Sequence, residues 1–168
     1  VLKVDVMHNA IKQAKEDSTN TKVILLDPRG IPFTQSLAEE LSKEESITLI
    51  CGHYEGYDER IRKYVDLEIS LGDFVLTGGE IPAMAIIDSV VRLLPGSLGK
   101  DESNEKESFA KTYKGRILEH PHYTRPEEYD GNKVPEELLS GNPKIIDKMR
   151  ENEAEKITQD KRPDLISS

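Results

Sequence analysis

The chain contains little cysteine, few aromatic residues and no long hydrophobic run. Cys51 is the only cysteine among 168 residues. No disulfide can therefore form within the chain, which is typical of proteins in a reducing cytosol. No run of about 18 apolar residues occurs, so the sequence predicts no membrane span. No secretory signal peptide is recognisable, and because the chain begins at Val1 we expect it to be a fragment of a cytoplasmic protein.

Basic charge is also scarce. The chain has 23 Lys and Arg residues against 32 Asp and Glu residues, which gives a formal net charge of −9. This balance argues against broad, charge-driven binding of nucleic acid, although it is compatible with a local basic site. The patterns GxGxxG and GxxxxGK[ST] do not occur, so neither an ordinary dinucleotide site nor a P-loop is expected.

Apolar segments alternate with helical patterns over the first part of the chain. The apolar segments are continuously hydrophobic, as strands are when helices cover both faces of a parallel sheet. The sequence therefore predicts an α/β domain over residues 1–99, with a parallel sheet flanked by helices. The predicted strands are residues 22–26, 47–51 and 66–70. The predicted helices are residues 1–15, before the first strand, and residues 34–43 and 58–64, between the strands.

Glycine-rich segments follow all three predicted strands, at residues 27–30, 52–56 and 72–79. In parallel sheets, ligands bind beyond the carboxyl ends of the strands. We therefore expect these segments to converge on a ligand site. In the second segment, Tyr54 would lie beside an adenosine-like group and Glu55 would hold a polar ligand atom. The alternative is a plain tight turn in which Asp58 caps the next helix.

A helix is predicted to start at Glu80, directly after two glycines, and to stop at Pro95-Gly96. Its apolar residues surround much of the axis, so a largely buried helix is expected. Asp88 and Arg92 lie four residues apart. Their spacing favours an ordinary ion pair of about 0.3–0.5 kcal/mol over an arginine directed at a substrate anion. The residues predicted to face inward are Ile81, Met84, Ile87, Val91 and Leu94, widened by Ile86, Val90 and Leu93.

The composition changes after residue 99. Residues 100–116 are rich in charge and are predicted to form a flexible linker or lid, with an ordinary solvated loop as the alternative. Residues 117–168 predict a partial helical region, in which Asn142 caps a helix that runs to about Ile157. His120 and His122 have no ligand partner at a matching spacing, so a structural or surface role is expected rather than a metal site.

Several motifs resemble the bacterial tRNA (guanine-N1)-methyltransferase family of the SPOUT class. They are LLDPRG at residue 25, LICGHYEGYDER at 49, EISLGDFVLTGGEIPAMAIIDSVVRLLPGSLG at 68, HPHYTRP at 120, VPEELLSGNP at 134 and RPDL at 162. The resemblance implies a deep trefoil knot, a homodimer with its active site at the subunit interface, and tRNA as substrate. It also implies methylation of N1 of the guanosine 3′ of the anticodon.

The resemblance further implies S-adenosylmethionine as cofactor, held in the knot, with assistance from Mg²⁺. Carried over by motif, the cofactor contacts are Leu25, Leu26, Asp27, Pro28, Gly52, Tyr54, Glu55, Gly56, Ser70, Leu71, Gly72, Phe74, Leu76, Gly78 and Gly79.

The catalytic pair implied by the resemblance is Arg92 and the carboxylate before Ser108-Phe109. The family has an aspartate at that position, whereas this chain has Glu107. Spacing alone does not choose a base among the acidic residues Asp101, Glu102, Glu105 and Glu107. The resemblance also leads us to expect that the family's opening strand and most of its carboxy-terminal tRNA-binding domain lie outside this sequence. The alternatives are another SPOUT RNA methyltransferase and a non-catalytic module that binds S-adenosylmethionine or RNA.

Overall fold

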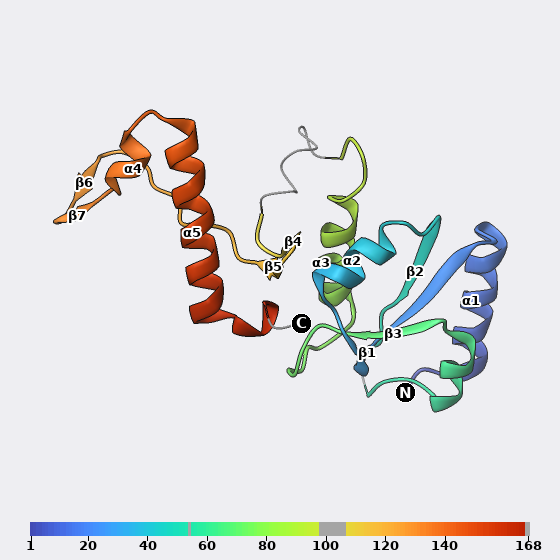
Figure 1. The fold of residues 1–168 in the computed structure, drawn as a ribbon. Coiled ribbons are helices and arrows are strands. Elements are labelled where there is room, and N and C mark those ends of the chain that lie inside the picture. Colours follow the sequence, from blue (N-terminus) through green and yellow to red (C-terminus); the bar gives the residue numbers. More distant parts are fainter. Residues whose placement is uncertain (54, 98–106, 167–168) are drawn as a thin grey trace. The chain divides into compact units, whose positions relative to one another are not determined.

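The computed structural model describes residues 1–53, 55–97 and 107–166 (Figure 1). The chain divides into two compact units, Val1–Gly99 and Lys100–Ser168. Each unit is described by itself.

A three-stranded parallel sheet forms the centre of the first unit. The central strand is β1 (Thr21–Pro32), and β2 (Ser46–Ile50) and β3 (Leu67–Ser70) pair with it on either side. Both pairings are parallel. The predicted α/β class and the predicted parallel sheet flanked by helices are therefore confirmed.

Alternate residues of β1 feed two separate cores, because successive side chains of a strand point to opposite faces. Ile24 and Leu26 face α2 (Gln35–Leu41) and α3 (Glu80–Val91), and pack with Leu37 and Ile86. Val23 and Leu25 face α1 (Val4–Asp17) and the 3-10 helix η1 (Glu59–Tyr64), which contributes Ile61. Helices thus cover both faces of the sheet, as Figure 1 shows.

The prediction that the first strand stops at Leu26 and is followed by a turn at residues 27–30 is wrong. β1 continues to Pro32 and pairs again with β3 after a register shift between Leu26 and Ile31. Gly30 permits this close approach, since a Cβ atom there would lie 2.4 Å from the backbone nitrogen of Ile69. Residues 27–30 therefore form an irregularity within the strand, of the kind that re-aims side chains next to a site.

Helix α3 starts at Glu80 as predicted, and Ile86 and Val90 are buried as predicted, but the stripe placed at the centre of the buried side is not. Ala83, Ile86 and Val90 are buried against α2 and the sheet. The stripe predicted to face inward is exposed instead: Ile81, Met84, Ile87, Val91 and Leu94 are 61%, 68%, 51%, 45% and 41% exposed. The helix is apolar on nearly every side, so its periodicity could not identify the side that packs on the sheet.

The second unit combines a long helix with small antiparallel ribbons. β4 (Ala110–Thr112) pairs with β5 (Gly115–Ile117), and β6 (Glu128–Tyr129) pairs with β7 (Asn132–Lys133). The helices are α4 (Glu136–Leu139), α5 (Pro143–Lys161) and the 3-10 helix η3 (Pro163–Leu165). The predicted cap of α5 is confirmed, because the Asn142 side chain accepts a hydrogen bond from the Lys144 nitrogen at 3.1 Å.

The predicted linker or lid lies partly outside the described residues, at positions 100–106. Its remaining part is more ordered than predicted, because residues 110–116 belong to the β4–β5 ribbon. A hydrogen bond of 2.6 Å from the Phe109 nitrogen to the Ile117 oxygen extends this ribbon. Among the described residues, no helix combines the length and apolar composition needed to cross a bilayer.

Candidate ligand-binding site

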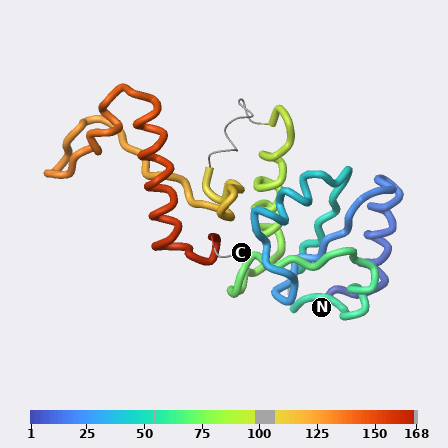
Figure 2. The backbone as a smooth tube through the Cα atoms, in the orientation of Figure 1, coloured from blue at the N-terminus to red at the C-terminus, as the bar shows by residue number. Residues whose placement is uncertain are grey.

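A cavity of about 320 Å³ lies in the first unit, at the carboxyl ends of the sheet strands. All three glycine-rich segments line it. Figure 2 follows the backbone through these segments, which lie far apart in the sequence. The predicted residues that line the cavity are Leu26, Asp27, Pro28, Gly52, Glu55, Gly56, Ser70, Leu71, Gly72, Phe74, Leu76, Gly78 and Gly79.

Backbone hydrogen bonds hold the second and third segments together. The Gly79 nitrogen donates to the Gly52 oxygen at 2.8 Å, and His53 and Gly78 form an isolated antiparallel bridge. Gly79 has to be a glycine for this packing, because a Cβ atom there would lie 2.6 Å from the Cys51 Cα atom. The wall of the cavity is thus built from two backbones in direct contact.

The start of the chain supports the second segment from its other side. The Leu2 nitrogen donates to the Gly56 oxygen at 2.8 Å, and the Asp58 nitrogen donates to the Leu2 oxygen at 3.0 Å. The Asp58 side chain also caps η1 by accepting from the Arg60 nitrogen at 2.9 Å. The capping role considered for Asp58 is therefore confirmed, while Glu55 lines the cavity.

Charged side chains form a cluster around Asp27, in the first segment. The Asp27 side chain, which is 9% exposed, accepts hydrogen bonds from the Tyr57 hydroxyl and from Arg62 Nη2, the latter at 2.9 Å. Arg62 also contacts Glu68, and its guanidinium lies 5.6 Å from the centre of the Tyr57 ring. Arg29 extends the cluster outward through an ion pair of 2.8 Å with Glu59.

The environment of this cluster changes the proton affinity of its members. Burial, together with the hydrogen bond to Asp27, raises the pKa of the Tyr57 hydroxyl well above its usual range. Burial and the nearby charge of Asp27 raise the pKa of Glu68. Tyr57 is therefore protonated at neutral pH and donates a hydrogen bond to Asp27.

The cavity wall combines backbone groups, apolar side chains and carboxylates. Leu26, Phe74 and Leu76 supply apolar surface, and Glu55 supplies a carboxylate. Cys51 lies beneath the third segment, and burial followed by the charge of Glu80 raises the pKa of its thiol, so it stays protonated. Such a wall suits a ligand with an apolar or aromatic part, several hydrogen-bonding groups and a positive charge.

Two of the predicted contacts stand apart from the others. Leu25 is fully buried in the core beneath α1 and does not line the cavity, because it points to the opposite face of the sheet from Leu26. Tyr54 lies outside the described residues. Six other residues of the wall are not among the contacts carried over by motif. These are Arg29, His53, Tyr57, Ile69, Thr77 and Pro82, most of which lie within or next to the three segments.

The two residues predicted to be catalytic belong to different units. Arg92 follows the last residue of α3 and is half-buried, with its backbone nitrogen 3.3 Å from the Asp88 oxygen. Glu107 is half-buried at the start of the second unit, where its carbonyl accepts from the Ala110 nitrogen at 3.1 Å. Their roles stay predictions.

The fold and the cavity together define a class: an α/β domain with a cavity of small-molecule size at the carboxyl ends of a parallel sheet. Comparison with known proteins identifies the group within this class. The family model described as tRNA (Guanine-1)-methyltransferase TrmD matches residues 1–168, and the chain belongs to this family.

Individual relatives agree with this assignment. The chain is 53% identical over 166 residues to a tRNA (guanine-N(1)-)-methyltransferase of Clostridium tetani, covering 99% of this chain and 67% of the relative. It is 54% identical over 170 residues to the protein of the same name from Bacillus pumilus, and the match covers 100% of this chain and 68% of that relative. It is 50% identical over 171 residues to the protein of the same name from Listeria monocytogenes, and the match covers 100% of this chain and 68% of that relative.

Proposed function

We propose that this protein transfers a methyl group from S-adenosylmethionine to N1 of the guanosine that follows the tRNA anticodon. The observation that supports this most directly is the meeting of three glycine-rich segments around one cavity, in a chain of the tRNA (Guanine-1)-methyltransferase family. The names of its relatives indicate the reaction, and the cavity would hold the methyl donor.

The cavity fits the methyl donor in size and chemistry. Its volume of about 320 Å³ falls at the lower end of the range for small-molecule sites, about 300–1,000 Å³. The backbone groups of residues 52–56 and 70–79 would bind the adenosine, and the carboxylate of Glu55 would attract positive charge. S-adenosylmethionine, when bound, supplies a methyl group on a positively charged sulfur.

The chain's own residues would handle the proton and the charge of the substrate base. Guanine N1 carries a proton and is a poor nucleophile, so a general base has to remove this proton as the methyl group arrives. Glu107 is the proposed base and receives the N1 proton on its carboxylate. Negative charge then develops on guanine O6, and the guanidinium of Arg92 is proposed to stabilise it.

A homodimer follows from the same proposal, and α3 supports it. An apolar stripe of Ile81, Met84, Ile87 and Val91 is exposed along this helix, 45–68% for each residue. Exposed apolar residues that form a continuous stripe are typical of a protein interface. We propose that the stripe packs against a second copy of the chain, so that each active site combines residues of two subunits.

The remaining features of the proposal rest on family membership alone. They are the knotted path of the chain through the three segments, the cytoplasmic location expected for an enzyme that acts on tRNA, and assistance by Mg²⁺. We assign no residue to Mg²⁺, and no step above depends on it.

The decisive experiment incubates the intact protein with radiolabelled S-adenosylmethionine and tRNA transcripts. The labelled position is then mapped with a matched transcript that has adenosine after the anticodon. Transfer to guanosine N1 at that position is expected, and Glu107→Gln should lower the rate by roughly 10²–10⁴ if the base is lost. Labelling of another nucleotide would indicate a different RNA methyltransferase, and cofactor binding without turnover would indicate a binding module.

A further inference from the structure

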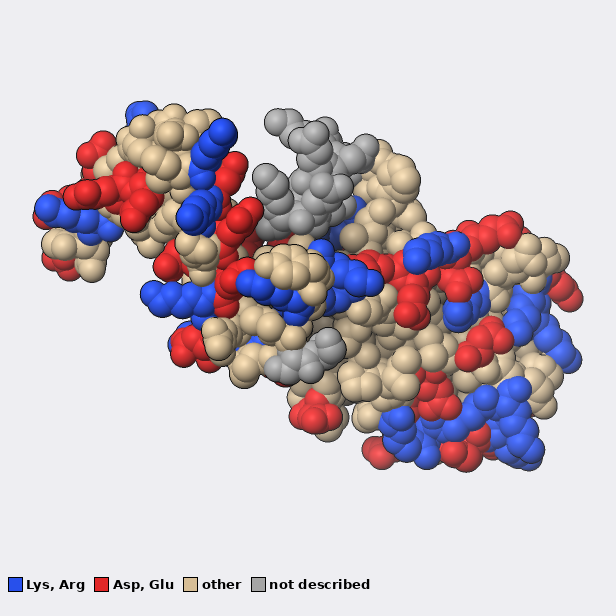
Figure 3. All heavy atoms as spheres, in the orientation of Figure 1, with Lys and Arg blue, Asp and Glu red and all other residues tan. Residues whose placement is uncertain are grey.

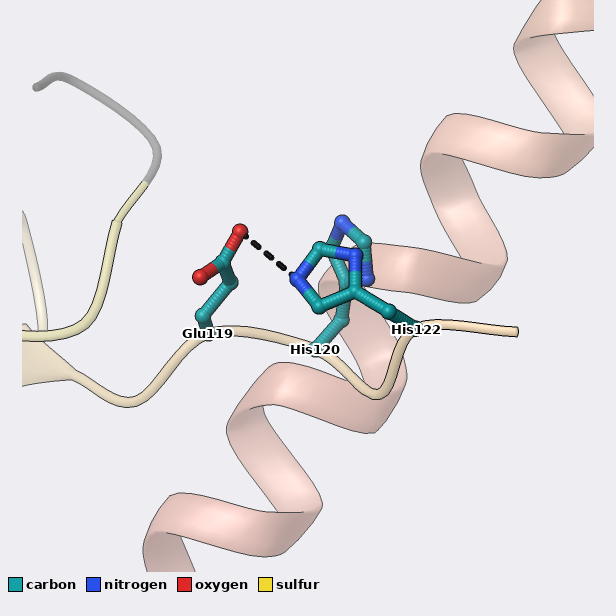
Figure 4. A group of neighbouring side chains, drawn as sticks. All are labelled: Glu119, His120 and His122. Carbon is teal, nitrogen blue, oxygen red and sulfur yellow. Dashed lines mark ion pairs between the residues drawn. The ribbon is translucent and has the colours of Figure 1, made fainter. Parts of the chain in front are cut away.

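Three side chains with metal-binding atoms meet in the second unit, directly after β5. They belong to Glu119, His120 and His122, and one ligand atom of each lies within 4.8 Å of the other two. Figure 4 shows the carboxylate of Glu119 facing the ring of His122, with the ring of His120 next to it. Glu119 Oε1 and His122 Nε2 are 3.0 Å apart.

The ring of His120 is held in a state suited to metal binding. Its Nδ1 atom lies 3.0 Å from the carbonyl oxygen of Pro121. A carbonyl oxygen can only accept a hydrogen bond, so Nδ1 has to carry the proton in this contact. The Nε2 atom of the neutral ring then keeps a free lone pair. Metal-binding histidines commonly show this arrangement, in which the second ring nitrogen donates to a carbonyl or carboxylate.

The backbone that carries the three residues is fixed to its surroundings within the second unit. The Leu118 nitrogen donates to the hydroxyl of Thr158 on α5 at 2.8 Å, and Thr158 is fully buried. The Glu119 nitrogen donates to the Ser108 hydroxyl at 3.0 Å. The side chain of His122 is 66% exposed and can turn. The backbone at Glu119 is therefore fixed, whereas the side chain of His122 can move to bind an ion.

The donor set selects the kind of ion. Two imidazole nitrogens and one carboxylate oxygen are the ligands of many Zn²⁺ sites that leave a fourth position open. Ligands about 2.0–2.2 Å from Zn²⁺ lie a little over 3 Å from one another in a tetrahedron, close to the distance between Glu119 and His122. Mg²⁺ prefers an octahedral shell of oxygen atoms, which this cluster does not provide.

We propose that Glu119, His120 and His122 form a Zn²⁺ site. The carboxylate and the two Nε2 atoms bind the ion, and the proton between Glu119 and His122 is released to solvent. Two cavities of about 450 Å³ each border this group, and His120 lines both of them. The fourth position of the ion is therefore accessible to water or to a small ligand. The spacing of the histidines alone predicts no such site, because it leaves out the adjacent carboxylate.

The test titrates the intact, untagged protein with ZnCl₂ after dialysis against a chelator, with binding followed by calorimetry. One Zn²⁺ bound per chain is expected, with little heat from MgCl₂. Co²⁺ replaces Zn²⁺ in a second titration, because four-coordinate Co²⁺ absorbs strongly in the visible range. His122→Ala and Glu119→Gln should each weaken Zn²⁺ binding by at least about tenfold and reduce this absorption.

His8→Gln is the matched control, because His8 lies in the first unit and stacks on Tyr64 at 3.6 Å. It should leave Zn²⁺ binding unchanged. Circular dichroism of each variant checks that the fold is retained. The proposal is overturned if Zn²⁺ does not bind, if Mg²⁺ binds as tightly, or if His122→Ala and Glu119→Gln bind Zn²⁺ like the parent protein. Each of these readouts is independent of methyl transfer.

Discussion

The charged cluster around Asp27 leads to a quantitative prediction about the stability of the cavity wall. Arg62 contacts both Asp27 and Glu68, and its own side chain is 15% exposed. Replacing Arg62 with methionine keeps most of the apolar stem but removes the charge. The carboxylate of Asp27, which is 9% exposed, would then keep only Arg29 as a cationic partner, whose Nε lies 3.5 Å away on a side chain that is 62% exposed.

The expected cost follows from this burial. Removing one partner of a buried ion pair costs about 3–5 kcal/mol, because the other charge is left uncompensated. Arg29 still compensates part of the Asp27 charge, and Glu68 is 27% exposed and can regain some hydration, so the lower end of this range applies. We therefore expect Arg62→Met to lower the free energy of unfolding by about 3 kcal/mol. Tyr57→Phe removes only one hydrogen bond to the same carboxylate and should cost about 1.5–3 kcal/mol.

A double-mutant cycle separates the ion pair from other effects of the substitution. Urea unfolding is measured for Arg62→Met, for Asp27→Asn and for the double variant. If Arg62 compensates Asp27, the loss in free energy of unfolding of the double variant is smaller than the sum of the two single losses by about 2 kcal/mol. A coupling below about 0.5 kcal/mol would show that Arg62 does not compensate Asp27. The same variants should bind S-adenosylmethionine more weakly, because Asp27 and its neighbours line the cavity.

Three further predictions concern other parts of the first unit. Gly79→Ala should lower the free energy of unfolding by about 1–3 kcal/mol and weaken cofactor binding in calorimetry, because its Cβ would lie 2.6 Å from the Cys51 Cα. The control is Gly131→Ala, which lies in the other unit with open space around it and should leave cofactor binding unchanged. Hydrogen bonds from Arg60 lower the pKa of Asp58 to about 2. The ionised Asp58 therefore contributes its full stabilisation above pH ~4 and loses it as the pH falls toward 2. In Asp58→Asn, the loss of stability between pH ~4 and 2, followed by circular dichroism, should be smaller. Ile87→Glu on the exposed stripe of α3 should convert a dimer into a monomer in analytical ultracentrifugation, and a dimer that persists would contradict the proposed interface.

Patterns of apolar residues predicted the sheet and the place of the cavity, but not which individual residues reach it. Leu25 and Leu26 are neighbours in one apolar run, and strand geometry sends them to opposite faces. A continuous apolar strand does not reveal which face lies next to the cavity. Likewise, residues 27–30 resemble a turn in composition, and only their contact with Glu68 and Ile69 keeps them within β1.

The ribbon of β6 and β7 was missed although the sequence contains a signal for it. Asp130-Gly131 is a dipeptide typical of tight hairpins, and both residues adopt positive φ angles of 49° and 76°. The cluster around Asp27 left no comparable signal. Its members lie in β1, in the loop before η1, in η1 and in β3, so only the folded chain brings them together: they are Asp27, Tyr57, Arg62 and Glu68.

The distribution of charge decides how the proposed substrate can be recognised. The net charge of −9 repels a polyanion at long range, so tRNA would not be attracted by the chain as a whole. On the face drawn in Figure 3, basic and acidic side chains lie interspersed. Arg29, which lines the cavity, is paired with Glu59, and Arg60 and Arg62 on η1 are also paired with carboxylates. Recognition therefore has to rely on contacts at short range, and a second subunit that adds its own groups to each site would supply more of them than one chain can.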